Sequence, residues 1–144
     1  MAASREAIMT ALFALVSGSA SFVTASRRLQ LWDTVPSASK PAIFMYERGD
    51  EYKGAERYLP PTVTMNVDLF IYIDAGKDQS IAPITVLNPL VDAVDTALKP
   101  GNNGRQTLGG LVSHCYIDGK IMKDPGDIDG DGVAVIPVKI LATL

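Results

Sequence analysis

Residues 62–73 constrain the fold more than any other part of the chain. Every odd position in this stretch is apolar, whereas the even positions begin with Thr, Thr, Asn and Asp. Successive side chains of a β-strand point to opposite faces, so strict alternation predicts one long strand with a buried face and a wetter face. Phe70 and Tyr72 fall at the end of the wetter face, so we expect a partner or the protein's own loops to cover it there.

Four more segments have the composition of strands, and they are residues 42–47, 111–117, 120–123 and 133–141. The dipeptide Asp118-Gly119 predicts a two-residue hairpin between the second and the third of them. Pro137 lies inside the last segment and has no N–H to donate to a ladder. We therefore expect the closing strand to lie at a sheet edge or to carry a bulge.

Two amphipathic helices are predicted. The first follows an N-cap at Ser4, places Ile8, Leu12 and Val16 with Leu15 on one stripe, and stops at Gly18. The second buries Leu90, Val91, Val94 and Leu98 and ends before Pro100-Gly101. Its start stays open: Asn88 can cap it with Pro89 in the first turn, or it begins near Pro83 and bends at Pro89. The sum is an α+β fold with a mostly antiparallel or mixed sheet of about five strands and two helices packed on one face.

Length and composition indicate a single domain spanning residues 1–144. The hydrophobic share of 47% excludes wholesale disorder. The net charge is -3 and Arg27-Arg28 is the only adjacent basic pair, so no specific nucleic-acid binding is expected. Cys115 is the only cysteine, which excludes an internal disulfide and fits a protein that folds in a reducing cytoplasm. The apolar run near the N-terminus is interpreted as a helix rather than a signal peptide, and no membrane span is expected.

Three carboxylates precede the last predicted strand. Asp127, Asp129 and Asp131 with Gly132 match the first half of a calcium-binding EF-hand loop. The twelfth position, which needs a bidentate Glu, is Val138, and no helix flanks the loop. The EF-hand interpretation therefore fails, and an acidic solvent turn is expected, with a weak Ca²⁺ or Mg²⁺ contact as the alternative.

No catalytic residues and no cofactor are expected. Ser113, His114 and Cys115 are adjacent, but neighbours on a strand point to opposite faces, so His114 cannot serve either nucleophile as a base. His114 is also the only histidine. The glycine-rich loops carry no phosphate-binding lysine, so they predict no nucleotide site.

The most interface-like residues lie in polar segments. Arg27, Arg28 and Trp32 form one candidate cluster, because Arg and Trp are favoured at interface centres, although a buried Trp with solvated arginines is an equal alternative. Residues 48–61 and 100–107 are interpreted as long polar loops that become ordered in an assembly. They add the candidates Arg48, Asp50, Glu51, Tyr52, Arg57 and Arg105. The Arg-Gly-Asp triplet at 48–50 is attributed to chance rather than to cell adhesion.

Several stretches, taken in order, resemble one known family over nearly the whole chain. They are "SREAIMTALFALV", "SRRLQLWDTVPSASKPAIF", the long alternating strand, "VLNPLVDAVDTAL", "QTLGGLVSHCYIDGKI" and "VAVIPVKIL". This pattern is similar to that of the tail terminator (minor tail, gpU-like) proteins of long-tailed bacteriophages, prophages and gene transfer agents. The "DIDGDG" loop departs from the family pattern.

The resemblance implies a function without an active site. It implies an α+β subunit that forms a ring with copies of itself, typically a hexamer, on the head-proximal end of the tail tube. The ring stops polymerisation of the tail tube protein and presents a surface to the head-completion or connector protein. Such a protein would be located in the virion tail, after assembly in the bacterial cytoplasm. A head–tail connector protein and a small cytoplasmic ligand- or Ca²⁺-binding domain are the alternatives.

Overall fold

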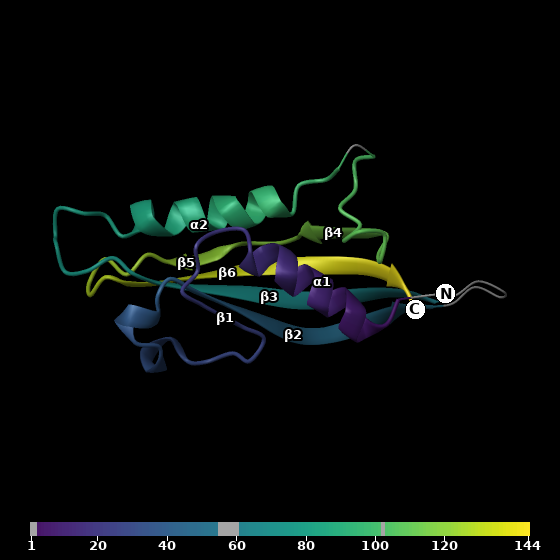
Figure 1. Cartoon of the computed structure of the whole chain (residues 1–144), viewed down its shortest axis with the longest axis horizontal. Coiled ribbons are helices and arrows are strands. Elements are labelled where there is room, and N and C mark those ends of the chain that lie inside the picture. Colours follow the sequence, from purple (N-terminus) through teal and green to yellow (C-terminus); the bar gives the residue numbers. More distant parts are fainter. Residues whose placement is uncertain (1–2, 55–60, 102) are drawn as a thin grey trace.

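The computed structural model describes residues 3–54, 61–101 and 103–144, in which two helices pack against one six-stranded sheet (Figure 1). The elements in chain order are α1 (Arg5–Ser17), β1 (Thr24–Ser26), the 3₁₀ turns η1 (Trp32–Thr34) and η2 (Ser37–Ser39), β2 (Ala42–Lys53), β3 (Thr62–Asp74), α2 (Ile84–Ala97), β4 (His114–Ile117), β5 (Met122–Asp124) and β6 (Asp131–Thr143). The α+β fold predicted from the sequence is confirmed.

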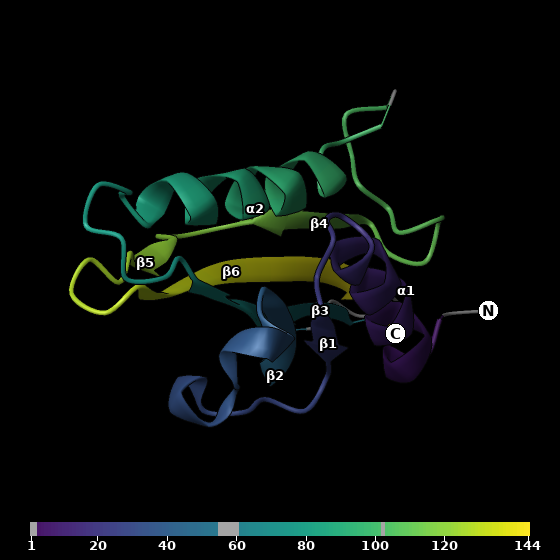
Figure 2. The same cartoon turned by 60° about the vertical axis from the view of Figure 1, so that its left-hand side comes forward.

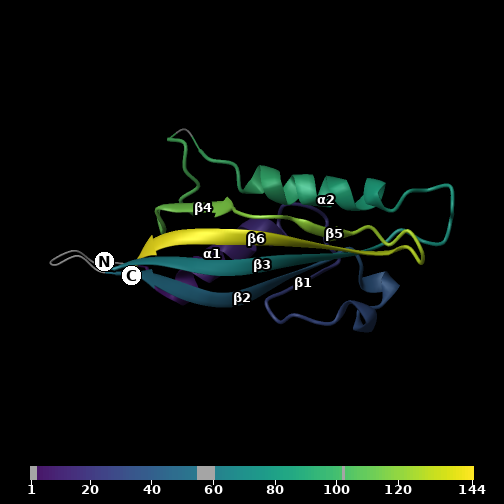
Figure 3. The same ribbon diagram turned by 180° about the vertical axis from the view of Figure 1, so that it is seen from behind.

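The sheet is mixed but mostly antiparallel. Its order is β1-β2-β3-β6-β4, and β5 also pairs with β6. Only β1 runs parallel to its neighbour, β2. Three long strands, β2, β3 and β6, make the body of the sheet, and the short strands lie outside them (Figure 3). The sixth strand, which exceeds the predicted five, is β1, in a segment whose sequence is only weakly extended in character.

The central strand β3 has the predicted alternation. Its odd-numbered residues from Val63 to Ile73 are at most 1% exposed, while Thr62 is exposed and Thr64 half-buried. The odd face meets both helices in one core, which includes Ile8 and Leu12 of α1 and Leu87 and Val94 of α2. Fully burying an aliphatic side chain contributes about 1.5–3 kcal/mol, so this strand supplies much of the stability. Figure 2 shows α2 lying along β6 on this side of the sheet.

A side-chain cap explains where α1 starts, whereas α2 starts without one. The Ser4 hydroxyl accepts a hydrogen bond from the Ala7 N–H at 3.1 Å, and α1 ends against Gly18, as predicted. The open question about α2 is settled in favour of the earlier start, with Pro83 at the N-cap position and Pro89 inside the helix. Pro89 removes the hydrogen bond to the residue four positions earlier, and the helix continues because Leu87, Val91 and Val94 are buried in the core.

The predicted loop over residues 48–61 is wrong in its first part. Strand β2 extends to Lys53, with an irregularity between Glu47 and Gly49, and pairs with β3 along its polar half. The side chains there are exposed and mostly polar. The sequence therefore shows no alternation of apolar and polar residues from which a strand could be predicted. Backbone hydrogen bonds to β3 nevertheless hold the segment in the sheet. Residues 55–60, which include Arg57, lie outside the described part of the chain.

The predicted hairpin at Asp118-Gly119 is also wrong. Strands β4 and β5 do not pair with each other but lie one after the other along the same side of β6. The expectation that Pro137 places its strand at an edge or in a bulge is also wrong, since β6 lies between β3 and these two strands and its register with β3 is unbroken at Pro137. Asp118 donates its N–H to the Pro137 carbonyl at 3.2 Å, so the proline faces the gap between β4 and β5. The missing N–H of Pro137 is therefore not required by the ladder with β3.

A second, smaller apolar cluster lies on the sheet face opposite the helices. Ala42, Phe44 and Tyr72 of the sheet are buried there together with Val35, which belongs to the chain that connects β1 to β2. The Tyr72 hydroxyl donates a hydrogen bond to the Gln30 carbonyl at 2.7 Å. The protein's own loop thus covers this end of the face, which is one of the two outcomes expected from the sequence.

In the described residues no helix is long and apolar enough to cross a membrane.

The first prediction tests the phase of β3. Val67→Asp should leave no cooperatively folded protein, because an unpaired carboxylate in this fully buried position costs several kcal/mol against a typical total stability of about 5–15 kcal/mol. Thr62→Asp, at an exposed position of the same strand, should change the melting temperature little. Thermal unfolding followed by circular dichroism distinguishes the two variants, and a stable, cooperative Val67→Asp protein would contradict the assigned core.

Candidate interaction surfaces

The larger part of strand β2 forms an open edge of the sheet. Strand β1 pairs with β2 only from Ala42 to Phe44, and beyond that point the described residues place no strand beside it. Residues 46–53, called the β2 edge below, therefore have a sheet neighbour on one side only. Tyr46 is 46% exposed and Tyr52 is 58% exposed on this segment. Unpaired strand edges are places where another chain can add a strand.

Ion pairs connect the β2 edge to the first helix. Arg5 donates a hydrogen bond from Nε to Asp50 at 2.7 Å, and its guanidinium also contacts the Tyr52 hydroxyl. These contacts hold two interface candidates, Asp50 and Tyr52, against α1. They are exposed to solvent, so each contributes little to stability, but together they define the orientation of the side chains at this edge.

Arg27 is part of a second set of ion pairs within the chain. It contacts Glu6 of α1 at 2.6 Å and Glu47 of β2 at 2.9 Å. Hydrogen bonding to Glu6 raises the pKa of Arg27, and the same contact lowers the pKa of Glu6. Arg28, the next residue, is exposed and its backbone N–H bonds to the Ser26 hydroxyl. Arg27 therefore joins β1, α1 and β2, while Arg28 faces solvent.

Charged residues also occupy the uncovered part of the sheet face opposite the helices. Arg48 contacts Asp68 at 3.2 Å, and Glu51 accepts a hydrogen bond from Asn66 at 3.4 Å. Burial raises the pKa of Asp68, while the nearby Arg48 acts in the opposite direction. The interface candidates Arg48 and Glu51 thus lie on one strand facing β3, and not in a loop as the sequence predicted.

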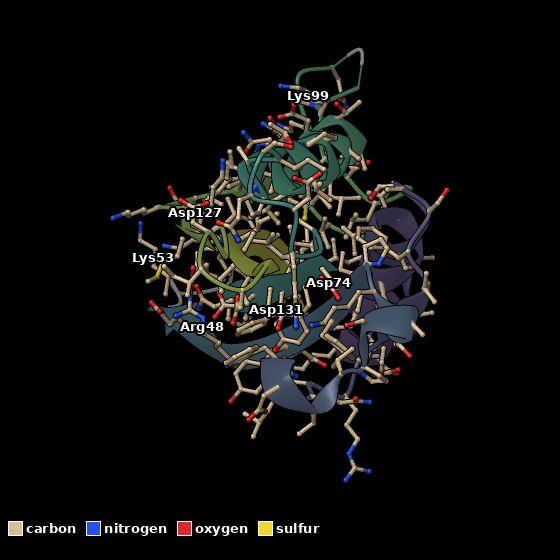
Figure 4. All side chains as sticks on the ribbon, turned by 90° about the vertical axis from the view of Figure 1, so that its left-hand side faces the viewer. Arg48, Lys53, Asp74, Lys99, Asp127 and Asp131 are labelled. Carbon is tan, nitrogen blue, oxygen red and sulfur yellow. The ribbon has the colours of Figure 1, made fainter. Side chains whose placement is uncertain are left out.

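The acidic loop, residues 124–131, lies at the end of the sheet where β6 begins (Figure 4). Its carboxylates have different partners. Asp131 contacts the nearly buried Lys40 ammonium at 3.1 Å, and Asp129 accepts the Asp131 N–H at 3.0 Å. Across the described ranges, no group of three His, Cys, Asp or Glu side chains is placed to hold a metal ion. The geometry therefore resembles a turn closed by its own side chains.

Trp32 lies beside this acidic loop. A groove of about 410 Å³ is lined by Trp32 of η1, by Ile128 at the tip of the loop and by Val133 of β6. Trp32 is 46% exposed, so the buried-Trp alternative does not hold. The structure thus separates the predicted Arg27/Arg28/Trp32 cluster, since Arg27 is bound to α1 and β2 whereas Trp32 faces the acidic loop.

The nucleophile-like residues of β4 point to opposite faces, as predicted. Cys115 is fully buried in the helix-facing core, and burial raises the pKa of its thiol to about 12. His114 lies on the other face, stacked on Tyr116 with ring centroids 4.8 Å apart. Its Nδ1 accepts the Gln106 N–H at 3.1 Å, so this histidine fastens the preceding loop to the sheet.

Some residues of these surfaces are not distinguished by the sequence pattern. Arg105 is exposed in the loop before β4, consistent with its predicted position, but no interaction within the described part of the chain connects it to the β2 edge or to Trp32. Ile128, which is 92% exposed, and Met122, which is 62% exposed, were not predicted as surface contacts. An isoleucine between two aspartates in a glycine-rich turn is the local signal that could have identified the first.

Comparison with protein-family models and with curated proteins found no match to this chain.

The second prediction concerns calcium. Because Asp129 and Asp131 already bond within the protein, millimolar Ca²⁺ should leave the melting temperature of the wild type unchanged. The double variant Asp127→Asn, Asp129→Asn should be equally insensitive and serves as the control. A ligand that binds only the folded state raises its stability by mass action, so a calcium-dependent rise in the wild type alone would contradict this prediction.

The third prediction concerns acid stability through Asp74, which lies opposite Asp131 at the ends of β3 and β6. A hydrogen bond from Ser37 and one from the Gly76 N–H at 2.8 Å lower the pKa of Asp74 below its ordinary value of 3.8. A carboxyl group with a lowered folded-state pKa stabilises the fold above the unfolded-state pKa and loses this effect as pH falls through the folded-state value.

Asp74→Asn should therefore reduce the free energy of unfolding at neutral pH by roughly 1 kcal/mol, the difference between hydrogen bonds to charged and neutral acceptors. The reduction should disappear in acid below the folded-state pKa. Urea titrations of both proteins across this range measure the effect, and a difference that is independent of pH would refute the assignment.

Proposed function

We propose that this protein is a structural subunit of a phage-like tail. Copies of the chain form a ring, with six subunits as in the resembling family, on the head-proximal end of the tail tube. The ring stops polymerisation of the tube protein and then provides the surface that joins the tail to the head-completion protein. The proposal rests on the family resemblance of the sequence, and the architecture supports it through one observation, the open β2 edge.

The β2 edge supports ring formation because the sheet has two different boundaries. One is the β2 edge, and the other is made by β4 and β5, which both pair with β6 on its far side from β3. A contact between one boundary of a subunit and the other boundary of its neighbour is heterologous, and such contacts close into a ring when the rotation is suitable. Strand addition would provide its main-chain hydrogen bonds.

The charges of the β2 edge suit a subunit that must not assemble too early. Glu47, Arg48, Asp50 and Lys53 lie along it, together with Glu51. Charged side chains on an exposed edge oppose uncontrolled pairing between identical chains. A ring would then form on the tube end, where contacts with the tube protein add to the weak subunit contact.

The proposal assigns the protein to the virion tail, after folding in the host cytoplasm. Its partners are other copies of itself, the tail tube protein and a head-completion or connector protein. A ring subunit has two ring faces besides its two subunit contacts, so it needs several distinct exposed surfaces. The described residues provide such surfaces on separate elements. Tyr46 and Tyr52 are exposed on β2, whereas Trp32 of η1 and Ile128 of the acidic loop are exposed beside the groove.

Electron microscopy of the purified protein, alone and mixed with tail tubes, tests the function. The expected result is rings bound to one end of each tube, and tubes that no longer grow when tube protein is added. Rings that bind isolated heads but not tubes would favour a connector protein instead. Protein that stays monomeric and leaves tube growth unchanged would refute the tail terminator proposal.

The fourth prediction tests the contact between the two sheet boundaries. Tyr46→Cys on β2 and Met122→Cys on β5 place exposed thiols on the same sheet face, at nearly the same level of the two boundaries, and the single native cysteine is buried. With tail tubes present, a short thiol cross-linker should convert the double variant into a ladder of covalent oligomers that ends at the ring size. Each single variant should give no product beyond a dimer. Rings without any ladder would contradict this subunit contact while leaving the proposed function intact.

A further inference from the structure

The groove beside Trp32 exposes apolar surface at a defined place. Trp32 is 46% exposed and Ile128 is 92% exposed, and Val133 of β6 lies with them along the groove. The groove lies at the end of the sheet where β3 ends and β6 begins. Exposed apolar side chains that gather in a groove, rather than singly, mark contact sites on soluble proteins.

Backbone hydrogen bonds close the loop that carries Ile128 and fasten it to the end of β3. Gly130 donates its N–H to the Gly126 carbonyl at 2.7 Å, and its own carbonyl accepts the Ala75 N–H at 2.8 Å. Both glycines have positive φ, and a Cβ on Gly130 would collide with the Gly76 carbonyl oxygen. The isoleucine is therefore presented by a preorganised turn, which reduces the entropy lost when a partner binds.

The rim of the groove is acidic. Asp124, Asp127, Asp129 and Asp131 line it, and among the described residues only Asp131 has a cationic partner, Lys40. Lys123, the nearest lysine in sequence, donates to Asn88 of α2 at 2.8 Å, so it is directed toward the helix side. The apolar groove thus has three carboxylates without a salt bridge in the described residues, and these attract cationic groups.

We propose that this groove binds a basic segment of a partner protein. An apolar side chain of the segment would lie between Trp32 and Ile128, and flanking Lys or Arg side chains would contact Asp124, Asp127 and Asp129. The inference goes beyond the proposed function, because it names the chemistry of a partner and requires no ring.

Charge complementarity selects this occupant over a second copy of the chain. A two-fold contact through the groove would place the acidic rim of one copy against the acidic rim of the other. Like charges facing each other across an interface oppose binding, whereas opposite charges favour it and speed the encounter. A partner segment with Lys or Arg on both sides of an apolar residue satisfies both parts of the groove.

The fifth prediction uses Trp32 as its own reporter, because it is the only tryptophan in the chain. The probes are capped peptides of the pattern Lys-Lys-X-Lys-Lys, with Leu, Ile, Met or Phe at X. At low salt at least one should shift the Trp32 emission to shorter wavelength in a saturable way, with an affinity of about 0.1 mM, and added salt should weaken the binding. The peptides with Ser at X, and with Glu in place of Lys, should not bind.

Variants locate the binding. Ile128→Ser should weaken it by about fivefold through the lost apolar contact. The double variant Asp127→Asn, Asp129→Asn should weaken it by about tenfold at low salt and remove most of the salt dependence. The matched controls, Val23→Ser at an exposed apolar position and Asp92→Asn on α2, should bind as the wild type does.

Three results would overturn the inference. The first is the absence of any saturable shift with all four peptides, and the second is equal affinity in the wild type and the groove variants. The third is a shift of the Trp32 emission with protein concentration in the absence of peptide, which would assign the groove to a second copy of the chain. The first two results do not bear on whether rings cap tail tubes, and the third bears only on which surfaces join the copies.

Discussion

The burial of the odd-numbered face of β3 is the interaction on which the rest of the structure depends. This strand pairs with β2 on one side and with β6 on the other, and its apolar face forms the core with α1 and α2. Because its long neighbours pair along most of their length with β3, their register follows from it. The ends and edges at which other proteins could bind are positioned by the same register.

The sheet face opposite the helices is covered by the chain at one end and carries charged and polar side chains toward the other. At one end the connection from β1 to β2 covers Phe44 and Tyr72, and it also carries Trp32, which lies beside the acidic loop. Toward the other end the face carries charged and polar side chains such as Arg48, Asp68 and Asn66. The core thus stabilises one face, while part of the other face and the β2 edge remain exposed.

Sequence patterns predicted correctly those features that depend on local chemistry. The phase of β3, the cap at Ser4 and the opposite orientation of His114 and Cys115 follow from periodicity and from neighbouring residues alone. The errors concern pairing between distant segments. The polar half of β2 has no apolar alternation, and the Asp118-Gly119 turn separates two strands that both pair with β6, so no local pattern could reveal either partner.

For the candidate surfaces, the sequence by itself determined which side chains are polar, which are apolar and which strand is central, because these depend on residue type and spacing. Only the tertiary structure decided that Arg27 is bound to Glu6 and Glu47 while Trp32 lines a groove with Ile128. These neighbours are far apart in the chain. The distance between them depends on where β2, β3 and β6 place η1 and the acidic loop. Long-range packing sets that geometry, and the spacing of residue types along the chain does not show which distant residues pack together.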